Sequence, residues 1–181
     1  MEGISKAQAR TLLVVRLIMG WGFLFAGLEK IFDLGGSGKA FSAAGFLKFA
    51  TGGGWPGVVA DAQGNLPVVN PTHDFWVSLA GNGSIMPIIN FLVVFGETAI
   101  GICLILGLAT RFASLCGVLM MSLFFVAAWS FTNGIVNEHL VYLIATATLG
   151  VFGAGRYYGL DAVVEKLAIV QRYPALHYAL G

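Results

Sequence analysis

Four long apolar stretches constrain this chain more than any other feature of its sequence. They carry few charged side chains and lie at residues 11–32, 86–108, 112–131 and 139–154. A helix crosses a bilayer core about 30 Å thick with about 20 mostly apolar residues, because each residue adds about 1.5 Å. The fourth stretch reaches this length if residues 137–138 and 155–156 lie at the interfaces. We therefore predict an all-α fold, an integral membrane four-helix bundle.

The composition favours lipid as the surrounding medium. Hydrophobic residues make up 57% of the chain and charged residues 10%, against about 25% charged residues in an average soluble domain. A soluble protein with so few charges would expose large apolar patches and aggregate. The net charge of +1 gives no reason to expect nucleic acid as a partner. The length of 181 residues predicts a single domain over residues 1–181.

The basic residues predict how the bundle is oriented. If four helices are threaded in order, six of these residues fall on one side: Lys6, Arg10, Arg111, Arg156, Lys166 and Arg172. Only Lys39 and Lys48 fall in the loops of the other side. Because cytoplasmic loops carry the excess of lysine and arginine, we expect both termini in the cytoplasm of a multi-pass protein of the cell membrane.

Two segments outside the apolar stretches are expected to have structure of their own. The long outer loop at residues 33–84 is rich in glycine, but Trp55, Phe75 and Trp76 among its aromatic residues favour an ordered segment. We predict a short interfacial helix at residues 40–49, a β-hairpin at 57–69 and a helix at 71–80. After the fourth stretch, the spacing of apolar residues predicts a surface helix at residues 161–171.

Glu97 is the strongest candidate for a functional residue within the apolar stretches. It stands about 11 residues from either end of its stretch, hence about 16 Å deep. An ionisable side chain at such a depth costs several kcal/mol unless it is paired or hydrated, so it marks a possible site. Helical spacing places it on one face with Asn90, Val94, Gly101 and Leu104.

The first apolar stretch has a matching face, made of Arg16, Gly20, Phe23, Gly27 and Lys30. An ion pair between Arg16 and Glu97 is geometrically possible. Such a pair would serve either to fix the register of two helices or to hold a carboxylate that carries protons or faces a ligand.

A second group of polar residues is expected at the outer end of the bundle. It comprises Glu29, Lys30, Trp129, Asn133, Glu138 and His139, all within about two helical turns of the predicted interface. Acids, a base, an imidazole and an indole in one layer could bind a polar headgroup or a quinone ring, and histidine could transfer protons there. Charged residues also gather at helix ends because water begins there, and both interpretations stay open.

Several other kinds of site are excluded by the sequence. A haem held between membrane-crossing helices would need two facing histidines, but only His139 lies at the end of one of the four apolar stretches. The glycine runs lack the spacing of phosphate-binding loops, and no metal-ligand cluster is visible. Cys103 and Cys116 form no C-x-x-C motif. We therefore expect no metal and no tightly bound cofactor.

The ordered motifs of the chain resemble the DoxX/DoxD group of small four-helix membrane proteins. They comprise Arg16-Leu17 with Gly20, Phe23, Gly27 and Lys30, then Gly96-Glu97 to Gly101, Leu104 to Leu108, Thr110-Arg111, and Gly153 to Asp161. Members of the DoxD type, together with a second small subunit, oxidise thiosulfate to tetrathionate and pass the electrons to quinone. Other members have no settled activity, and we expect no partner-subunit domain to be fused to this chain.

The resemblance implies a membrane subunit of a thiosulfate:quinone oxidoreductase, with quinone as the electron acceptor and a second small subunit as partner. Lys30 could attract thiosulfate or a quinone oxygen, with Arg16 also in the binding region. Glu29, Glu97 and His139 could supply protons as catalytic residues. Trp129 could stack on the ring beside Asn133 and Glu138. The alternatives are a non-catalytic membrane scaffold for redox or oxidative-stress enzymes and a small transporter.

Overall fold

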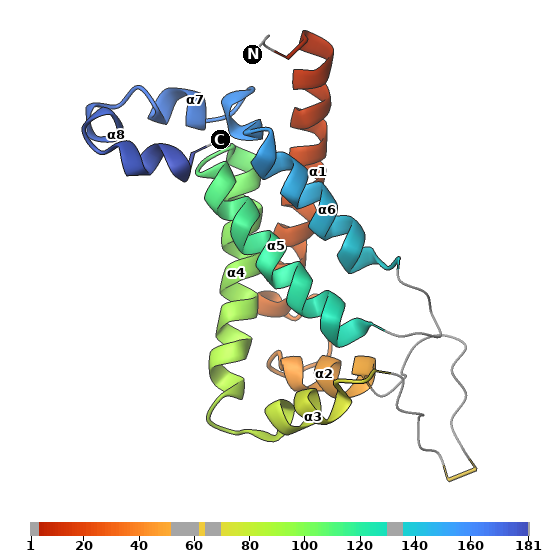
Figure 1. Ribbon diagram of the computed structural model, residues 1–181. Coiled ribbons are helices and arrows are strands. Elements are labelled where there is room, and N and C mark those ends of the chain that lie inside the picture. The colour runs from red at the N-terminus through yellow and green to blue at the C-terminus, as the bar shows by residue number, and fades with distance from the viewer. Residues whose placement is uncertain (1–3, 52–61, 64–69, 130–135, 181) are drawn as a thin grey trace.

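The computed structural model describes residues 4–51, 62–63, 70–129 and 136–180, and over these residues all regular structure is helical (Figure 1). The four longest helices are α1 (Lys6–Phe32), α4 (Met86–Leu106), α5 (Thr110–Ala128) and α6 (Glu138–Val151). Shorter segments follow or connect them: α2 (Ala43–Thr51), α3 (His73–Gly81), α7 (Asp161–Val164), α8 (Ala168–Arg172), and the 3₁₀ turns η1 (Ala154–Arg156) and η2 (Pro174–Tyr178). This confirms the all-α prediction for the described residues.

Three helices of the described chain are long and apolar enough to cross a bilayer, namely α1, α4 and α5. Helix α6 is apolar but has only 14 residues. Large apolar side chains point outward along the three long helices, for example Ile18, Phe91 and Leu119, which are 58–63% exposed. Such a surface is compatible with lipid and not with water, so the chain is a membrane protein.

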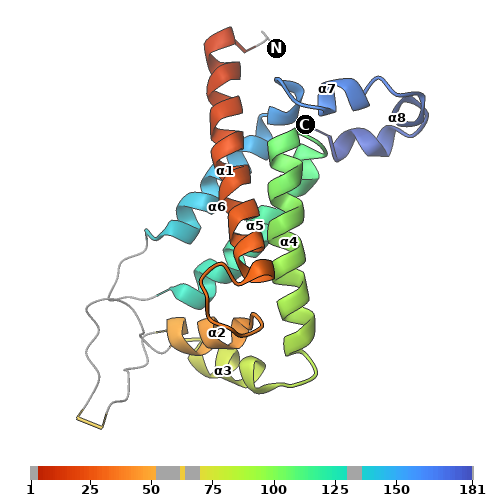
Figure 2. The ribbon, with the colours of Figure 1, turned by 180° about the vertical axis from the view of Figure 1, so that it is seen from behind.

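Helices α1 and α4 lie side by side and antiparallel, and α5 packs against both α4 and α6 (Figures 1 and 2). Phe23, Ile100, Leu104 and Leu149 are buried between them. The buried face of α1 includes four of the five predicted residues, Arg16, Gly20, Phe23 and Gly27. On α4 the predicted face is confirmed at Glu97, Gly101 and Leu104, while Val93 is buried in place of Val94.

Helices α2 and α3 cover the end of the bundle opposite the chain termini (Figure 2). Leu47, Trp76 and Ala80 pack there against Met86 and Ala127. The short helices predicted at residues 40–49 and 71–80 are therefore present, shifted by one to three residues. The predicted hairpin at 57–69 lies outside the described residues, except for a turn at 62–63.

Two asparagines connect this covering layer to the long helices. The side-chain amide of Asn70 donates to the backbone carbonyls of Val126 and Ala127 at 2.8 and 2.9 Å, and so satisfies the C-terminal end of α5. The side-chain oxygen of Asn90 on α4 accepts a hydrogen bond of 2.8 Å from the backbone N–H of Ala43 at the start of α2. Helix α2 is thereby held across the end of α4.

Asp33 ends α1 in the left-handed backbone conformation, with φ of 48°. Its carboxylate accepts hydrogen bonds from the Ser37 hydroxyl and from the backbone N–H groups of Ser37 and Gly38. These donors stabilise the ionised form and lower the pKa of Asp33 below its usual value.

The surface helix predicted at residues 161–171 is divided in two. Leu167 adopts an extended backbone, with φ of −68° and ψ of 140°, which ends one helical segment and starts α8. The interruption leaves Glu165 beside Arg156, with a 2.6 Å ion pair between its Oε1 and the guanidinium Nη2.

Candidate functional site: a cavity between five helices

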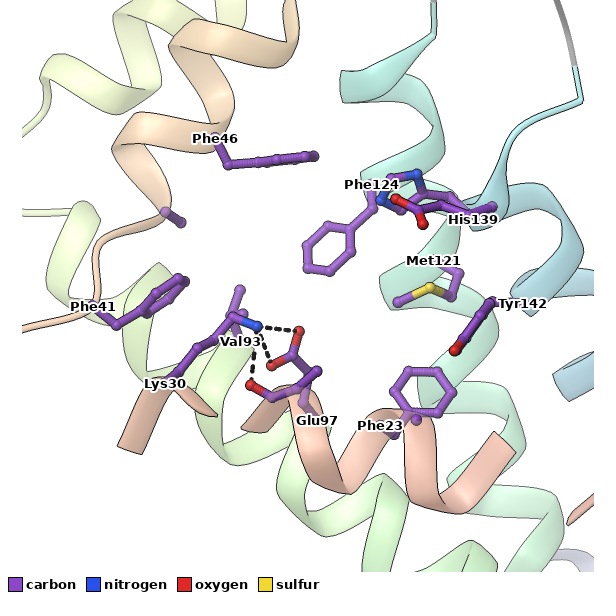
Figure 3. A pocket seen from close by; sticks show the side chains of 14 residues that line it. Phe23, Lys30, Phe41, Phe46, Val93, Glu97, Met121, Phe124, His139 and Tyr142 are labelled. Carbon is purple, nitrogen blue, oxygen red and sulfur yellow. Dashed lines mark hydrogen bonds and ion pairs between the residues drawn. The ribbon is translucent and has the colours of Figure 1, made fainter. Parts of the chain in front are cut away.

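A cavity of about 330 Å³ lies between α1, α2, α4, α5 and α6 (Figure 3). This volume is at the lower end of the range for small-molecule sites, about 300–1,000 Å³. Most of its wall is aromatic or aliphatic, and the ionisable side chains among the described lining residues are Lys30, Glu97, Glu138, His139 and Tyr142.

Lys30 and Glu97 form an ion pair in the wall of this cavity. The ammonium Nζ donates a 3.1 Å hydrogen bond to Oε1 of Glu97 and lies 2.9 Å from Oε2, a contact between charges without hydrogen-bond geometry. It also donates to the Ala26 carbonyl at 3.1 Å and lies 5.4 Å from the centre of the Phe41 ring. Glu97 is 4% exposed. The lone carboxylate of α4 therefore points into the protein and is neutralised there, as a buried charge requires.

An aromatic wall faces the ion pair across the cavity (Figure 3). The His139 ring lies 5.9 Å from the Phe124 ring and 6.1 Å from the Phe46 ring, centre to centre. Below them, Tyr142 packs edge-on against Phe23 at 5.9 Å. The Nδ1 atom of His139 is buried and has no hydrogen-bond partner among the described residues. A ligand in the cavity would meet aromatic faces, an imidazole and a paired lysine.

The comparison with known families decides what kind of protein carries this cavity. The model of the DoxX family matches residues 11–133, which include most of α1, all of α2 to α5 and more than half of the chain. The chain belongs to the DoxX family. No curated protein and no solved structure gives a significant match to it. The resemblance predicted from the motifs is thus confirmed at the level of the DoxX family, and the DoxD type stays a prediction.

The structure of this DoxX protein brings together four of the eight predicted site residues. Lys30, Glu97, Glu138 and His139 line the cavity, with Glu138 exposed at its edge. Glu29 is exposed and Trp129 is half-buried just beyond the end of α5. Neither of these two is among the described lining residues. Asn133 lies outside the described residues.

The pairing of Arg16 with Glu97 that the sequence suggested is wrong, because Glu97 forms its ion pair with Lys30. Arg16 lies 14 residues before Lys30, about 21 Å away along α1. Its guanidinium donates to the backbone carbonyls of Ala154, Tyr157 and Tyr158 at 2.7, 3.3 and 3.0 Å. It is 1% exposed. In this DoxX protein Arg16 therefore connects α1 to the segment after α6 and is remote from the cavity.

The motif at residues 153–161, which lies outside the matched residues 11–133, has a structural explanation at this same end. The carboxylate of Asp161 accepts hydrogen bonds from the backbone N–H groups of Ala109 and Thr110 at 2.7 and 3.0 Å, at the start of α5. A side chain at Gly107 or Gly159 would collide with the Arg16 guanidinium. These glycines leave the space in which Arg16 reaches its carbonyl partners.

Sequence reasoning missed the aromatic lining of the cavity. Phe41 and Phe46 come from the loop and helix that follow α1, and Tyr142 lies one turn after Glu138 on α6. Tyr142 could have been found from its i, i+3 spacing to His139, which puts both on one face of the helix. No signal in the sequence shows that α2 folds back over the bundle. Among the described residues, no group of three or more potential ligands could hold a metal.

Proposed function

We propose that this cavity is a quinone-reduction site in the membrane subunit of a sulfur oxidoreductase that oxidises thiosulfate. The observation that carries the proposal is the Lys30–Glu97 ion pair, which faces an imidazole across a cavity with aromatic walls. A quinone ring offers aromatic faces and two carbonyl oxygens, and its reduction consumes protons. Aromatic side chains, a cationic donor and proton-carrying groups are the matching features.

The overall reaction converts two thiosulfates, one quinone and two protons into one tetrathionate and one quinol. Two electrons leave the sulfur and enter the quinone. Lys30 is charge-balanced by Glu97, and Glu138 adds a negative charge at the cavity edge. This balance favours a neutral quinone over the thiosulfate dianion. We therefore assign the cavity to the quinone and assign thiosulfate oxidation to a second small subunit.

Each lining residue has a proposed part in the reduction. Lys30 donates a hydrogen bond to one quinone oxygen as negative charge develops on it. His139 supplies one proton, and the Glu97 carboxylate takes up a proton from water and passes it to the quinone, with Glu138 and the exposed Glu29 as the route from water. Phe46 and Phe124 provide the stacking surface that the sequence assigned to Trp129.

We further propose that α6 is the fourth membrane-crossing helix and that both termini are cytoplasmic. The Arg16 hydrogen bonds place the residues after α6 beside the first half of α1, and Phe124, which packs on His139, lies one turn before the end of α5. Helix α6 therefore runs along α5 over most of the length of α5. The six basic residues that favour the cytoplasm belong to segments at the end of the bundle that holds both termini (Figure 1).

Glu97→Gln tests the proposal. In the complex purified from its native membranes in mild detergent, this variant should reduce a quinone analogue with thiosulfate at least about 100-fold more slowly, because it cannot deliver a proton. Glu165→Gln, the same change near the opposite end of the bundle, serves as the matched control and should retain the wild-type rate. Mass spectrometry of the purified complex should identify the second subunit.

Other results would contradict the proposal in distinct ways. If Glu97→Gln lowers the amount of folded protein, but the folded fraction reduces the quinone analogue at the normal rate, the ion pair has a purely structural role. Proton or solute flux in liposomes without any electron acceptor would favour a transporter. Co-purification of soluble redox enzymes, without quinone reduction by the membrane protein, would favour a scaffold.

A further inference from the structure

A second space of about 790 Å³ lies between α4 and α5 and continues over α2 and α3. Its described lining is apolar apart from the Trp76 indole and the thiols of Cys103 and Cys116. Along α4 the groove extends from Ile89 to Cys103, a distance of about 21 Å at helical rise. We refer to this space as the α4–α5 groove.

The α4–α5 groove adjoins the cavity. Four residues line both spaces, namely Ala43, Phe46, Val93 and Phe124. Phe46 and Phe124 thus have one side toward the Lys30–Glu97 pair and another toward the groove (Figure 3). The rims of the groove carry exposed apolar side chains, including Phe95 at 59%, Leu119 at 58% and Leu123 at 60%. A molecule in the groove would be in contact with lipid on one side and with the cavity on the other.

We infer that the α4–α5 groove binds the isoprenoid tail of the quinone whose ring occupies the cavity, so that the quinone enters sideways from the bilayer between α4 and α5. This inference rests on the proposed function of the cavity. A long, narrow, apolar groove that joins a compact polar cavity matches a molecule with a small head and a long branched hydrocarbon chain.

The charges of the cavity select this occupant over a phospholipid. A phospholipid tail could fill the groove, but a phospholipid that also filled the cavity would have to place its phosphate there. The cavity lies deep in the protein, since Glu97 is about 16 Å along α4 from Met86. Among the described lining residues, Lys30 is already neutralised by Glu97, and Glu138 would repel an anion. A quinone head is neutral and partitions into the bilayer by itself, so it avoids the cost of burying a charge.

Photo-labelling tests where the ring and the tail lie. The protein is reconstituted in phosphatidylcholine nanodiscs with one of two probes: a quinone with a photoreactive group on the ring, or a long-tailed quinone with that group midway along the tail. Labelled peptides are mapped by mass spectrometry. We expect the ring probe to label residues around the cavity and the tail probe to label α4 and α5, including the segments with Cys103 and Cys116.

Ala99→Phe gives the inference a sharper test. Ala99 is half-buried and lines the groove but not the cavity, so a phenyl ring there fills space needed by the tail. It should lower tail labelling of α4 and α5 several-fold and leave ring labelling of the cavity intact. The matched control is Ala147→Phe, at a half-buried alanine of α6 that is absent from both linings, and it should leave both patterns unchanged.

The outcomes separate this inference from the proposed function. Ring labelling in the cavity with tail labels spread evenly over the lipid-facing sides of α1 and α6 would overturn the groove assignment alone. Absence of ring labelling from the cavity would overturn the proposed function as well. Cross-links from the groove to a second copy of the chain, undiminished by long-tailed quinone, would show that a protein surface occupies the groove and would also overturn the inference.

Discussion

Arg16 and Lys30 are two cationic side chains of the same helix that have different kinds of partner. Both lie on the inward face of α1, yet Arg16 donates to three backbone carbonyls whereas Lys30 pairs with a carboxylate at a cavity. The carbonyls of η1 and of the two residues after it carry partial negative charge and need donors where water is excluded. The planar guanidinium supplies several donors in a fixed geometry, which a single ammonium cannot match.

Arg16→Lys should therefore destabilise the protein. The shorter reach of the ammonium and its single nitrogen would break at least one of the charge-assisted hydrogen bonds, at a cost of about 3 kcal/mol. Arg10→Lys, at an exposed position six residues earlier on α1, is the control and should change stability little. Denaturation of the detergent-solubilised protein measures both. Unchanged stability in Arg16→Lys would show that the carbonyl contacts contribute little to folding.

At the scale of elements, the contact between α1 and α4 depends on glycine. A methyl group at Gly101 would meet the backbone nitrogen of Leu24 and lie 2.7 Å from its Cα and Cβ atoms. One at Gly27 would meet Thr98, including its backbone nitrogen at 2.9 Å. Such close approach of backbones is a common basis of helix association in lipid, where the hydrophobic effect contributes little. It also brings Lys30 within reach of Glu97.

Gly101→Ala should push α1 and α4 apart. Because the obstructing atoms belong to the backbone and cannot rotate away, we expect a loss of about 1–3 kcal/mol in the free energy of unfolding. The control is Gly45→Ala in α2, where an added methyl group meets nothing within 4 Å. That change should be neutral or stabilising by up to about 1 kcal/mol, since alanine is the better helix former. Equal effects of the two substitutions would argue against backbone contact between α1 and α4.

At the scale of the whole molecule, the features predicted correctly were those encoded locally. Apolar runs of sufficient length located α1, α4 and α5, and helical periodicity placed Glu97 and the glycines on inward faces. The partner of Glu97 was not predictable in this way. It depends on the axial offset of two antiparallel helices, which is determined by where Gly20, Gly27 and Gly101 meet their neighbours.

The cavity was predicted only in part for a related reason. Lys30, Glu97 and His139 were recognised because ionisable groups near apolar runs are conspicuous. Phe46 was missed because its position depends on the α2 chain folding back, held by the hydrogen bond from Ala43 to Asn90. Such a long-range contact leaves no periodic pattern in the sequence. The break between α7 and α8 depends similarly on the extended backbone of Leu167.

The number of membrane crossings determines which compartment each end of the bundle faces, and cysteine accessibility measures that number. Ser37 follows α1 and Gln171 lies in α8, and both are exposed at opposite ends of the molecule. With Cys103 and Cys116 replaced by alanine, Ser37→Cys should react with a membrane-impermeant maleimide in intact cells, whereas Gln171→Cys should react only after lysis. This pattern requires four crossings, because α1, α4 and α5 alone would leave residues 37 and 171 on the same side. Labelling of both positions in intact cells would therefore show that α6 does not cross, and labelling of Gln171→Cys alone would reverse the orientation expected from the basic residues.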